Sequence, residues 1–154
     1  MKAILNVIYK LLVITDKIID KFFKNNFLYY FKDLFEKDLY IEKKILNKKV
    51  SFYIPNKVTK WRVGTFYEKE PETLEWIDTF NDSNKIIFWD IGANIGLYSI
   101  YAALKHKNIE IISFEPSTNN LRILSRNISI NNLEGKIKIN QFPLSDKTNE
   151  FASM

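Results

Sequence analysis

Apolar residues in the first part of the chain recur at helical spacing. Across residues 1–23, large hydrophobic side chains appear every three or four positions, and lysines and aspartates lie mostly on the other faces. The pattern predicts an amphipathic helix. Because Lys10, Asp16 and Lys17 interrupt it before about 20 apolar residues accumulate, this helix is not expected to span a membrane.

Two roles are open for the apolar face of this first helix. The simpler one is packing on the same domain or on a partner subunit. The alternative is peripheral contact with an anionic membrane surface, in which the apolar stripe enters the lipid and the lysines meet the headgroups.

The pattern changes twice before the main domain. Aromatic and charged residues suit a second helix across residues 25–47, and β-branched and aromatic residues across residues 49–66 predict two strands joined by a turn at Pro55 and Asn56. Pro71 then suits the first turn of another helix, since glutamates on either side of it favour the positive end of a helix.

From Lys85 onward, strand-like and helix-like segments alternate, which predicts a parallel sheet with crossover helices. The strands are expected at residues 86–90, 109–114 and 136–141, and the helices at residues 96–106 and 117–131. The apolar run from Ile86 to Trp89 is typical of a strand that is covered on both faces.

We therefore expect a chain in three parts. Residues 1–48 form a helical extension, residues 49–84 form a hairpin and a helix leading into the core, and residues 85–154 form the βαβαβ part of an α/β domain. The chain has 154 residues and a hydrophobic content of 46%, enough for one globular core.

Composition excludes several classes of function. The absence of cysteine excludes disulfides, thiolate metal sites and a cysteine nucleophile, and it fits a cytoplasmic location. The formal net charge of +5 comes from scattered lysines, so no nucleic-acid partner is expected. No spacing of histidines and acids suggests a metal site.

The junction after the first parallel strand carries the main chemical signal. Asp90 ends the strand, and Gly92 and Gly96 follow with Ala93 between them. Glycines let the backbone turn tightly there and let a ligand approach closely. The pattern lacks the middle glycine of a dinucleotide fingerprint, and a carboxylate at Asp90 would repel a pyrophosphate. It suits a ligand with an ammonium and a sulfonium group, such as S-adenosylmethionine (SAM).

Glu115 ends the next strand, at the tip beside the glycine loop. An acid at this place can accept hydrogen bonds from both ribose hydroxyls of an adenosine ligand. Dinucleotide and SAM sites share this feature, so Glu115 supports adenosine without separating the two cofactors.

Together these residues resemble a known family. The run from Trp89 to Ser99, the Phe114–Ser117 segment and the asparagine-rich stretch of residues 127–132 are similar to FkbM-type SAM-dependent methyltransferases. The resemblance covers about residues 62–146.

The resemblance implies a Rossmann-like class I SAM methyltransferase fold and a set of cofactor-binding residues. Those implied at the methionine end of SAM are Asp90, Gly92, Ala93, Asn94 and Gly96. Glu115 is implied on the ribose, and Glu70 with Thr73 is implied to close over the same site.

The implied reaction is O-methylation of a hydroxyl on a sugar or secondary metabolite, so a small molecule or glycan is the expected acceptor. Similar proteins continue through a fourth strand with an Asp-x-Glu-Gly type motif, whereas this chain stops at Met154. We therefore expect a sheet that is incomplete at its C-terminal side and an isolated chain without activity. No catalytic residue is identified; His106 is expected on the surface at a helix end, not as a general base.

Two other functions stay open from the sequence. One is a nucleotide- or NAD-binding oxidoreductase, against which Asp90 and the absent middle glycine argue. The other is a non-catalytic remnant that binds SAM weakly or serves as an interaction module.

Overall fold

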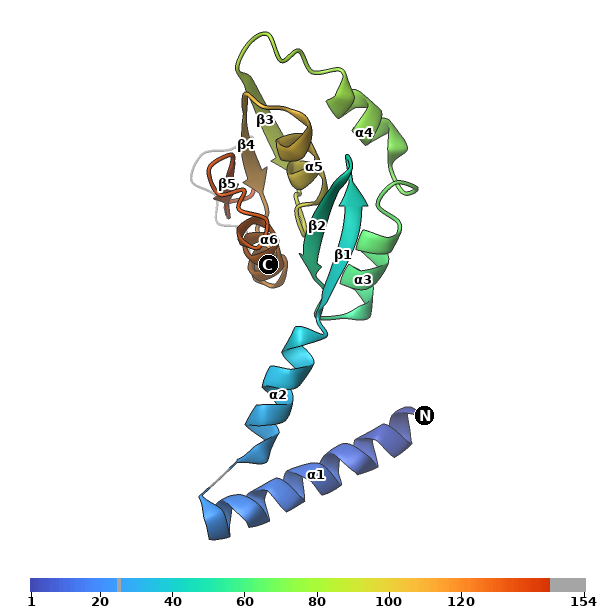
Figure 1. The fold of residues 1–154 in the computed structure, drawn as a ribbon, viewed down its shortest axis with the longest axis vertical. Helices are drawn as coiled ribbons and strands as arrows, with labels where there is room; N and C mark the ends of the chain where they lie inside the picture. Colours follow the sequence, from blue (N-terminus) through green and yellow to red (C-terminus); the bar gives the residue numbers. More distant parts are fainter. Residues whose placement is uncertain (25, 145–154) are drawn as a thin grey trace. The chain divides into compact units, whose positions relative to one another are not determined.

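The computed structural model of the chain describes residues 1–24 and 26–144 and divides into two compact units, Met1–Tyr40 and Ile41–Met154 (Figure 1). Residues 145 and 146, at the end of the family resemblance, lie outside the described residues. The helices are α1 (Lys2–Phe23), α2 (Phe27–Lys37), α3 (Lys57–Gly64), α4 (Pro71–Asp78), α5 (Leu97–Lys105) and α6 (Thr118–Ser129). The strands are β1 (Tyr40–Ile45), β2 (Lys48–Tyr53), β3 (Ile86–Ile91), β4 (Ile109–Phe114) and β5 (Ile137–Asn140).

The first unit is a pair of helices. The predicted first helix is confirmed as α1, whereas α2 ends at Lys37, earlier than predicted. The backbone N–H of Leu28, in the first turn of α2, donates to the buried carboxylate of Asp16 at 3.0 Å. This bond satisfies one of the N–H groups that the start of a helix leaves without a partner and ties α2 to α1.

The hairpin lies earlier in the chain than predicted. β1 and β2 form a two-stranded sheet, and Leu46 and Asn47 turn between them with φ angles of 48° and 64°. Positive φ at both central positions matches the turn that best suits a hairpin. The prediction of a turn at Pro55 and Asn56 was wrong, because Asn56 instead caps α3: its side chain accepts the N–H of Thr59 at 2.9 Å.

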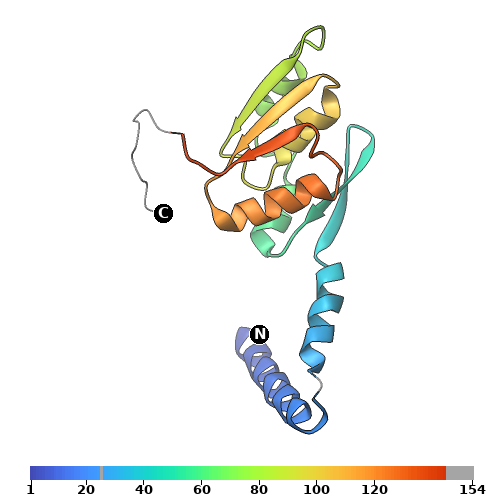
Figure 2. The same cartoon turned by 90° about the vertical axis from the view of Figure 1, so that its left-hand side faces the viewer.

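The predicted alternation of strands and helices from Lys85 onward is confirmed. β3, β4 and β5 form a parallel sheet in that order, with α5 and α6 as crossovers (Figure 2). In the register of this sheet Asp90 lies beside Ser113, and Phe114 lies beside Asn140. The second unit therefore has an α/β fold with a Rossmann-like βαβαβ arrangement.

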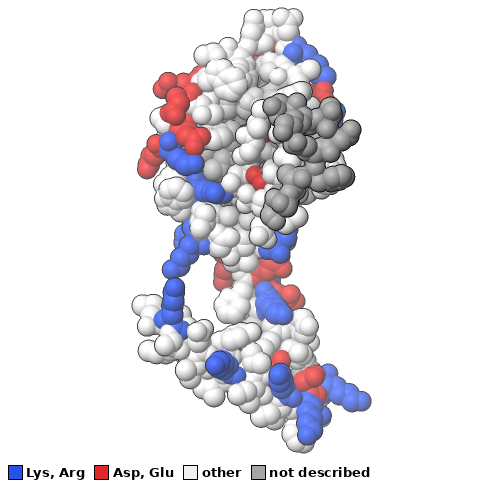
Figure 3. Space-filling view, turned by 180° about the vertical axis from the view of Figure 1, so that it is seen from behind, with Lys and Arg blue, Asp and Glu red and all other residues white. Residues whose placement is uncertain are grey.

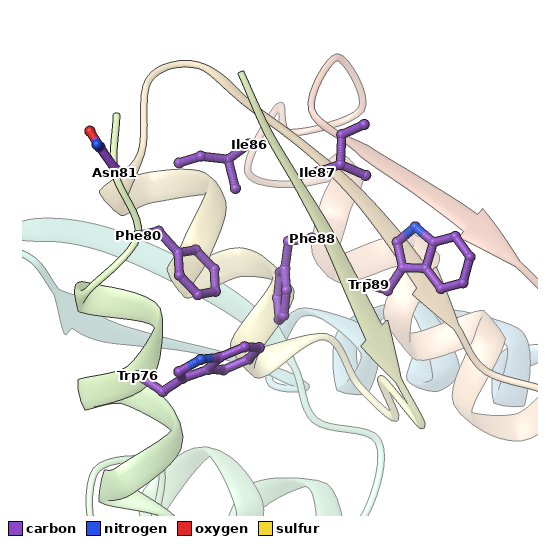
Figure 4. Close-up of a pocket in the computed structure, with 7 residues that line it drawn as sticks. All are labelled: Trp76, Phe80, Asn81, Ile86, Ile87, Phe88 and Trp89. Atoms are coloured by element: carbon purple, nitrogen blue, oxygen red, sulfur yellow. The ribbon is translucent and has the colours of Figure 1, made fainter. Parts of the chain in front are cut away.

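Among the described residues, β3 is covered on one face, not on two as its apolar sequence predicted. Phe88 is 5% exposed and packs against Trp76 and Phe80, with ring centroids 5.9 and 5.7 Å away. Ile87 and Trp89 point to the opposite side of the strand and are 63% and 52% exposed (Figure 4). An apolar run in which polar and apolar residues do not alternate therefore does not establish that both faces of a strand are packed.

His106 is buried, contrary to the prediction of a surface residue. Its Nδ1 lies 3.0 Å from Asp82, and its Nε2 lies 2.9 Å from the carbonyl oxygen of Ile77. The ring also stacks on Phe80. These contacts lie before β3 and after α5, away from the carboxyl ends of the strands, so His106 joins the α4 segment to α5.

Two asparagines, Asn127 of α6 and Asn131 just after this helix, connect the hairpin to the α/β core. Asn127, which is fully buried, accepts the N–H of Tyr53 at 2.8 Å and donates to the carbonyl of Ile95 at 2.9 Å. Asn131 accepts the N–H of Ser51 at 3.0 Å and donates to its carbonyl at 2.8 Å. The two side chains thus satisfy the outer edge of β2, and Asn127 also holds the loop after β3.

Candidate cofactor site

The loop between β3 and α5 has three residues with positive φ. The angles are 78° at Gly92, 55° at Asn94 and 86° at Gly96. A Cβ at Gly96 would lie 2.5 Å from Cδ1 of Leu124, so the loop and α6 approach closely there. A Cβ at Gly92 would meet nothing within 4 Å, which means that this part of the loop faces open space. Glycine is thus needed for packing at one position and leaves room at the other.

Backbone donors of the loop are already paired within the chain. The N–H groups of Gly92 and Ala93 both donate to the carbonyl of Phe114, at 2.9 and 3.0 Å. The N–H of Asn94 donates to Oε2 of Glu115 at 2.8 Å. A phosphate-binding loop instead points such groups at its ligand, so these three donors are not arranged for a pyrophosphate.

Asp90 is placed where a phosphate would rest in a dinucleotide site. It is 8% exposed, and its Oδ2 accepts the N–H of Ser99, in the first turn of α5, at 3.1 Å. The Ser99 hydroxyl donates to the same oxygen and lies 2.7 Å from the hydroxyl of Ser113. The positive end of α5 is therefore occupied by a carboxylate of the chain.

Burial and neighbouring acidic charges disfavour the ionised form of Asp90. Burial raises the pKa of Asp90, and the nearby charges of Glu115 and Glu70 raise it further, while hydrogen bonds from Ser99 oppose the rise. Glu115 and Glu70 are thus close enough to repel the negative charge of Asp90. A cationic ligand would relieve this repulsion, whereas an anionic ligand would increase it.

Glu115 holds the two backbone segments that meet at the carboxyl ends of β3 and β4. Besides Asn94, it accepts the N–H of Ser117 at 2.8 Å through Oε1. Each carboxylate oxygen has a second lone pair, so both can accept one further hydrogen bond. The structure therefore fixes the orientation of Glu115 while leaving it acceptor capacity.

A cavity of about 140 Å³ opens beside the loop. The residues that line it are Arg62, Phe66, Lys69, Glu70, Gly92, Ala93, Asn94, Ile95, Leu97 and Tyr98. Four of the seven predicted site residues are in this group, and Asp90, Gly96 and Glu115 support the loop that forms one wall. The structure thus brings all seven predicted residues to one place.

Glu70 and Tyr98 are hydrogen-bonded neighbours in the lining of this cavity. Hydrogen bonding from Lys69, 2.8 Å away, and then from Tyr98 lowers the pKa of Glu70. Burial, followed by the interaction with Glu70, raises the pKa of Tyr98. Tyr98 is therefore a hydrogen-bond donor to Glu70 at neutral pH, not a proton acceptor.

Arg62 is a residue of this site that the seven predicted site residues did not include. Residues 49–66, which contain Trp61 and Arg62, were predicted as two strands joined by a turn, but both residues lie on α3, and Trp61 is 54% exposed. The Arg62 guanidinium donates to the side-chain oxygen of Asn94. Because 32 residues separate the two, no local spacing could have signalled the contact.

A larger hollow of about 540 Å³ lies along β3 (Figure 4). Its lining consists of Trp76, Phe80, Asn81, Ile86, Ile87, Phe88 and Trp89. This lining has no ionisable side chain, in contrast to the cavity beside the glycine loop. We therefore assign the candidate cofactor site to the smaller, charged cavity.

Part of this chain is similar to a curated methyltransferase. The methyltransferase sdnD of Sordaria araneosa is 33% identical over 97 residues, which are 63% of this chain and 36% of that protein. The chain thus spans about a third of the length of this curated relative. The chain matches no family model.

Among solved structures, similarity is weaker. The C-terminal domain of precorrin-6Y C5,15-methyltransferase from Rhodobacter capsulatus aligns with a TM-score of 0.41 and 21% identity, over 49% of this chain and 40% of that one. A SAM-dependent methyltransferase from Agrobacterium tumefaciens aligns with a TM-score of 0.44 and 12% identity, over 67% of this chain and 32% of that one. These likenesses are too low to carry an argument about function.

Proposed function

We propose that this chain forms the cofactor-binding part of a SAM-dependent methyltransferase. The observation that carries the proposal is the carboxylate of Asp90 at the start of α5, where a dinucleotide-binding protein places a phosphate. The sequence identity of 33% with the methyltransferase sdnD, over 97 residues, supports the same proposal.

The residues of the site fit the chemistry of SAM. SAM carries a sulfonium whose methyl carbon a nucleophile can attack in line, with the S–C bond breaking and the neutral thioether leaving. The carboxylates of Asp90 and Glu70 supply negative potential for its cationic methionine end. Glu115 has free acceptor capacity for ribose hydroxyls, and Gly92 leaves open space beside the loop.

The side chains of this chain would mainly bind and orient. Arg62 holds the side chain of Asn94, Glu115 accepts the N–H of Asn94, and Asn127 donates to the carbonyl of Ile95, so three side chains hold this part of the loop. A loop fixed before the ligand arrives costs less entropy to order on binding.

For the acceptor, we propose a hydroxyl oxygen of a sugar or secondary metabolite. The support is the resemblance of the run from Trp89 to Ser99 to enzymes of that kind. Because the isolated chain is expected to be inactive, the test uses a chain extended through the further strands of similar proteins, incubated with methyl-labelled SAM and a panel of hydroxylated acceptors and read by mass spectrometry. Label on oxygen would support the proposal, and label on nitrogen or carbon would contradict it.

The location of the cofactor can be tested by NMR on the isotopically labelled chain. Addition of SAM should shift the amide signals of Gly92, Ala93, Asn94 and Glu115, and NAD at the same concentration should not. Absence of shifts, or shifts confined to the apolar hollow around Trp76 and Trp89, would contradict the proposal.

A further inference from the structure

The described part of residues 1–40 exposes most of its apolar side chains. Among the described residues of α1 and α2, only Asp16 is buried. A stripe of α1 residues three or four positions apart, here called the apolar stripe, is more than half exposed at every position. Its members are Ile4 (65%), Val7 (58%), Leu11 (59%), Ile14 (55%), Ile18 (53%) and Phe22 (73%).

The apolar stripe belongs to a wider apolar face. Leu5, Ile8 and Leu12 extend it on one side, so the face covers roughly half of the helix circumference at 3.6 residues per turn. A helix that pairs with another helix in a coiled coil needs only a narrow seam of positions. The width of this face suits a continuous apolar medium better than a second helix.

The lysines of α1 lie on a face of the helix beside the apolar one. Lys10, Lys17 and Lys21 are spaced by seven and four residues and therefore share one face, next to the apolar one. From Met1 to Lys24 the chain has five lysines and two aspartates, and one of these acids, Asp16, is buried against α2. Figure 3 shows one side of this helical unit, where lysines lie on a surface that is otherwise largely uncharged.

Aromatic residues gather where α1 ends and α2 begins. Phe22 and Phe23 are 73% and 77% exposed, and Tyr29 and Tyr30 are 62% and 63% exposed. Tyrosine rings, which carry a polar hydroxyl, are favoured at the boundary between headgroups and acyl chains, and the phenylalanine rings add exposed apolar surface. Within the described residues, the structure contains no helix long and apolar enough to cross a bilayer.

We propose that α1 lies in the surface of an anionic membrane, with its apolar stripe in the acyl region and its lysines at the headgroups. Anionic lipid matches the lysine face, and an interfacial helix of this kind combines a broad apolar face with a lysine-rich polar one. The proposal is independent of the cofactor site, because none of its residues lies there.

Binding to vesicles tests the proposal on the full chain. The chain should sediment with vesicles containing phosphatidylglycerol, much less with pure phosphatidylcholine, and binding should weaken as salt increases because surface attraction is screened. Equal binding to both kinds of vesicle, or to neither, would overturn the proposal.

Two pairs of variants separate the apolar and electrostatic contributions. Leu11→Glu with Ile18→Glu should abolish binding, while Val58→Glu, an equally exposed change on α3, should not. Lys10→Gln with Lys17→Gln should weaken binding about 25-fold, at about five-fold per lysine, while Lys57→Gln with Lys60→Gln should leave it unchanged. Equal effects of test and control variants would contradict a role for α1.

The alternative partner for the apolar stripe is a second copy of the chain. Sedimentation velocity without lipid measures this directly. A stable dimer that Leu11→Glu with Ile18→Glu dissociates, together with no vesicle binding, would assign the apolar stripe to self-association and overturn the membrane proposal. A loss of SAM binding would not affect either result.

Discussion

The carboxylate of Asp90 accepts the backbone N–H of Ser99 at 3.1 Å, and so it occupies the positive end of α5. This relationship links sheet, loop and helix, and it excludes an external anion from the position that phosphates use in dinucleotide sites. A buried acid held by one helix and repelled by two other carboxylates favours a cationic ligand.

Removing the charge of Asp90 should have different effects on the stability of the fold and on the affinity for SAM. Because the pKa of Asp90 is raised on folding, the folded chain binds this proton more tightly than the unfolded chain, and ionisation destabilises the fold. The destabilisation is present above the folded pKa and is lost below the unfolded one. Asp90→Asn should therefore be at least as stable as the wild type at pH 7.

Urea unfolding of both proteins at several pH values measures this effect. The stability advantage of Asp90→Asn should shrink as the pH falls toward the ordinary aspartate value of 3.8. Asp33→Asn, an exposed change on α2, is the control. An advantage that grows as the pH falls would show that the carboxylate stabilises the fold.

Gly96→Ala should destabilise the chain by about 1–3 kcal/mol, since the added methyl group meets Leu124 and the φ angle of 86° disfavours any side chain. Gly64→Ala, on α3, should be neutral or stabilising, because a Cβ there meets nothing within 4 Å. Thermal unfolding compares the two. Equal losses of stability would refute the close approach of the loop to α6.

Asn127→Ala should cost about 2–4 kcal/mol, because it leaves the N–H of Tyr53 and the carbonyl of Ile95 buried without partners. Asn119→Ala, at an exposed position of the same helix, is the matched control. Denaturant unfolding gives both values. A cost for Asn127→Ala as small as that of the control would mean that this side chain does not hold the hairpin and the loop together.

Tyr98→Phe should raise the pKa of Glu70 toward its ordinary value of 4.5, since it removes one of the two hydrogen bonds that lower it. The Lys69 contact remains, so the rise is partial. Tyr101→Phe removes a hydroxyl that donates to Asp78 and should leave Glu70 unchanged. An NMR titration of the Glu70 carboxyl carbon distinguishes the two variants, and an unchanged pKa in Tyr98→Phe would contradict the contact.

The sequence predicted the features that neighbouring residues encode and missed those that depend on contacts between distant residues. The alternation of strand-like and helix-like segments is a local signal, and the parallel sheet followed from it. Asp90, Glu115 and the glycines between them are also local, which is why the sequence could place them around one loop. Asn47 and Asn56 both favour turns, and local sequence did not show that the first closes the hairpin and the second caps a helix.

The remaining features depend on tertiary contacts. Arg62 reaches Asn94 across 32 residues, and His106 became buried because Asp82 and Ile77 provide partners for its ring. Neither contact leaves a periodic pattern in the sequence. Coverage of β3 also depends on which elements pack on each face, which an apolar run cannot specify.

The central claim is that the acidic site selects a cationic adenosine ligand, and the most direct test is titration calorimetry of the full chain with SAM and with NAD. We predict saturable binding of SAM, no binding of NAD, and an affinity for SAM about 10- to 100-fold lower in Asp90→Asn, the loss expected for one charged hydrogen bond. Binding of NAD in preference to SAM, or an affinity for SAM that Asp90→Asn leaves unchanged, would contradict the account.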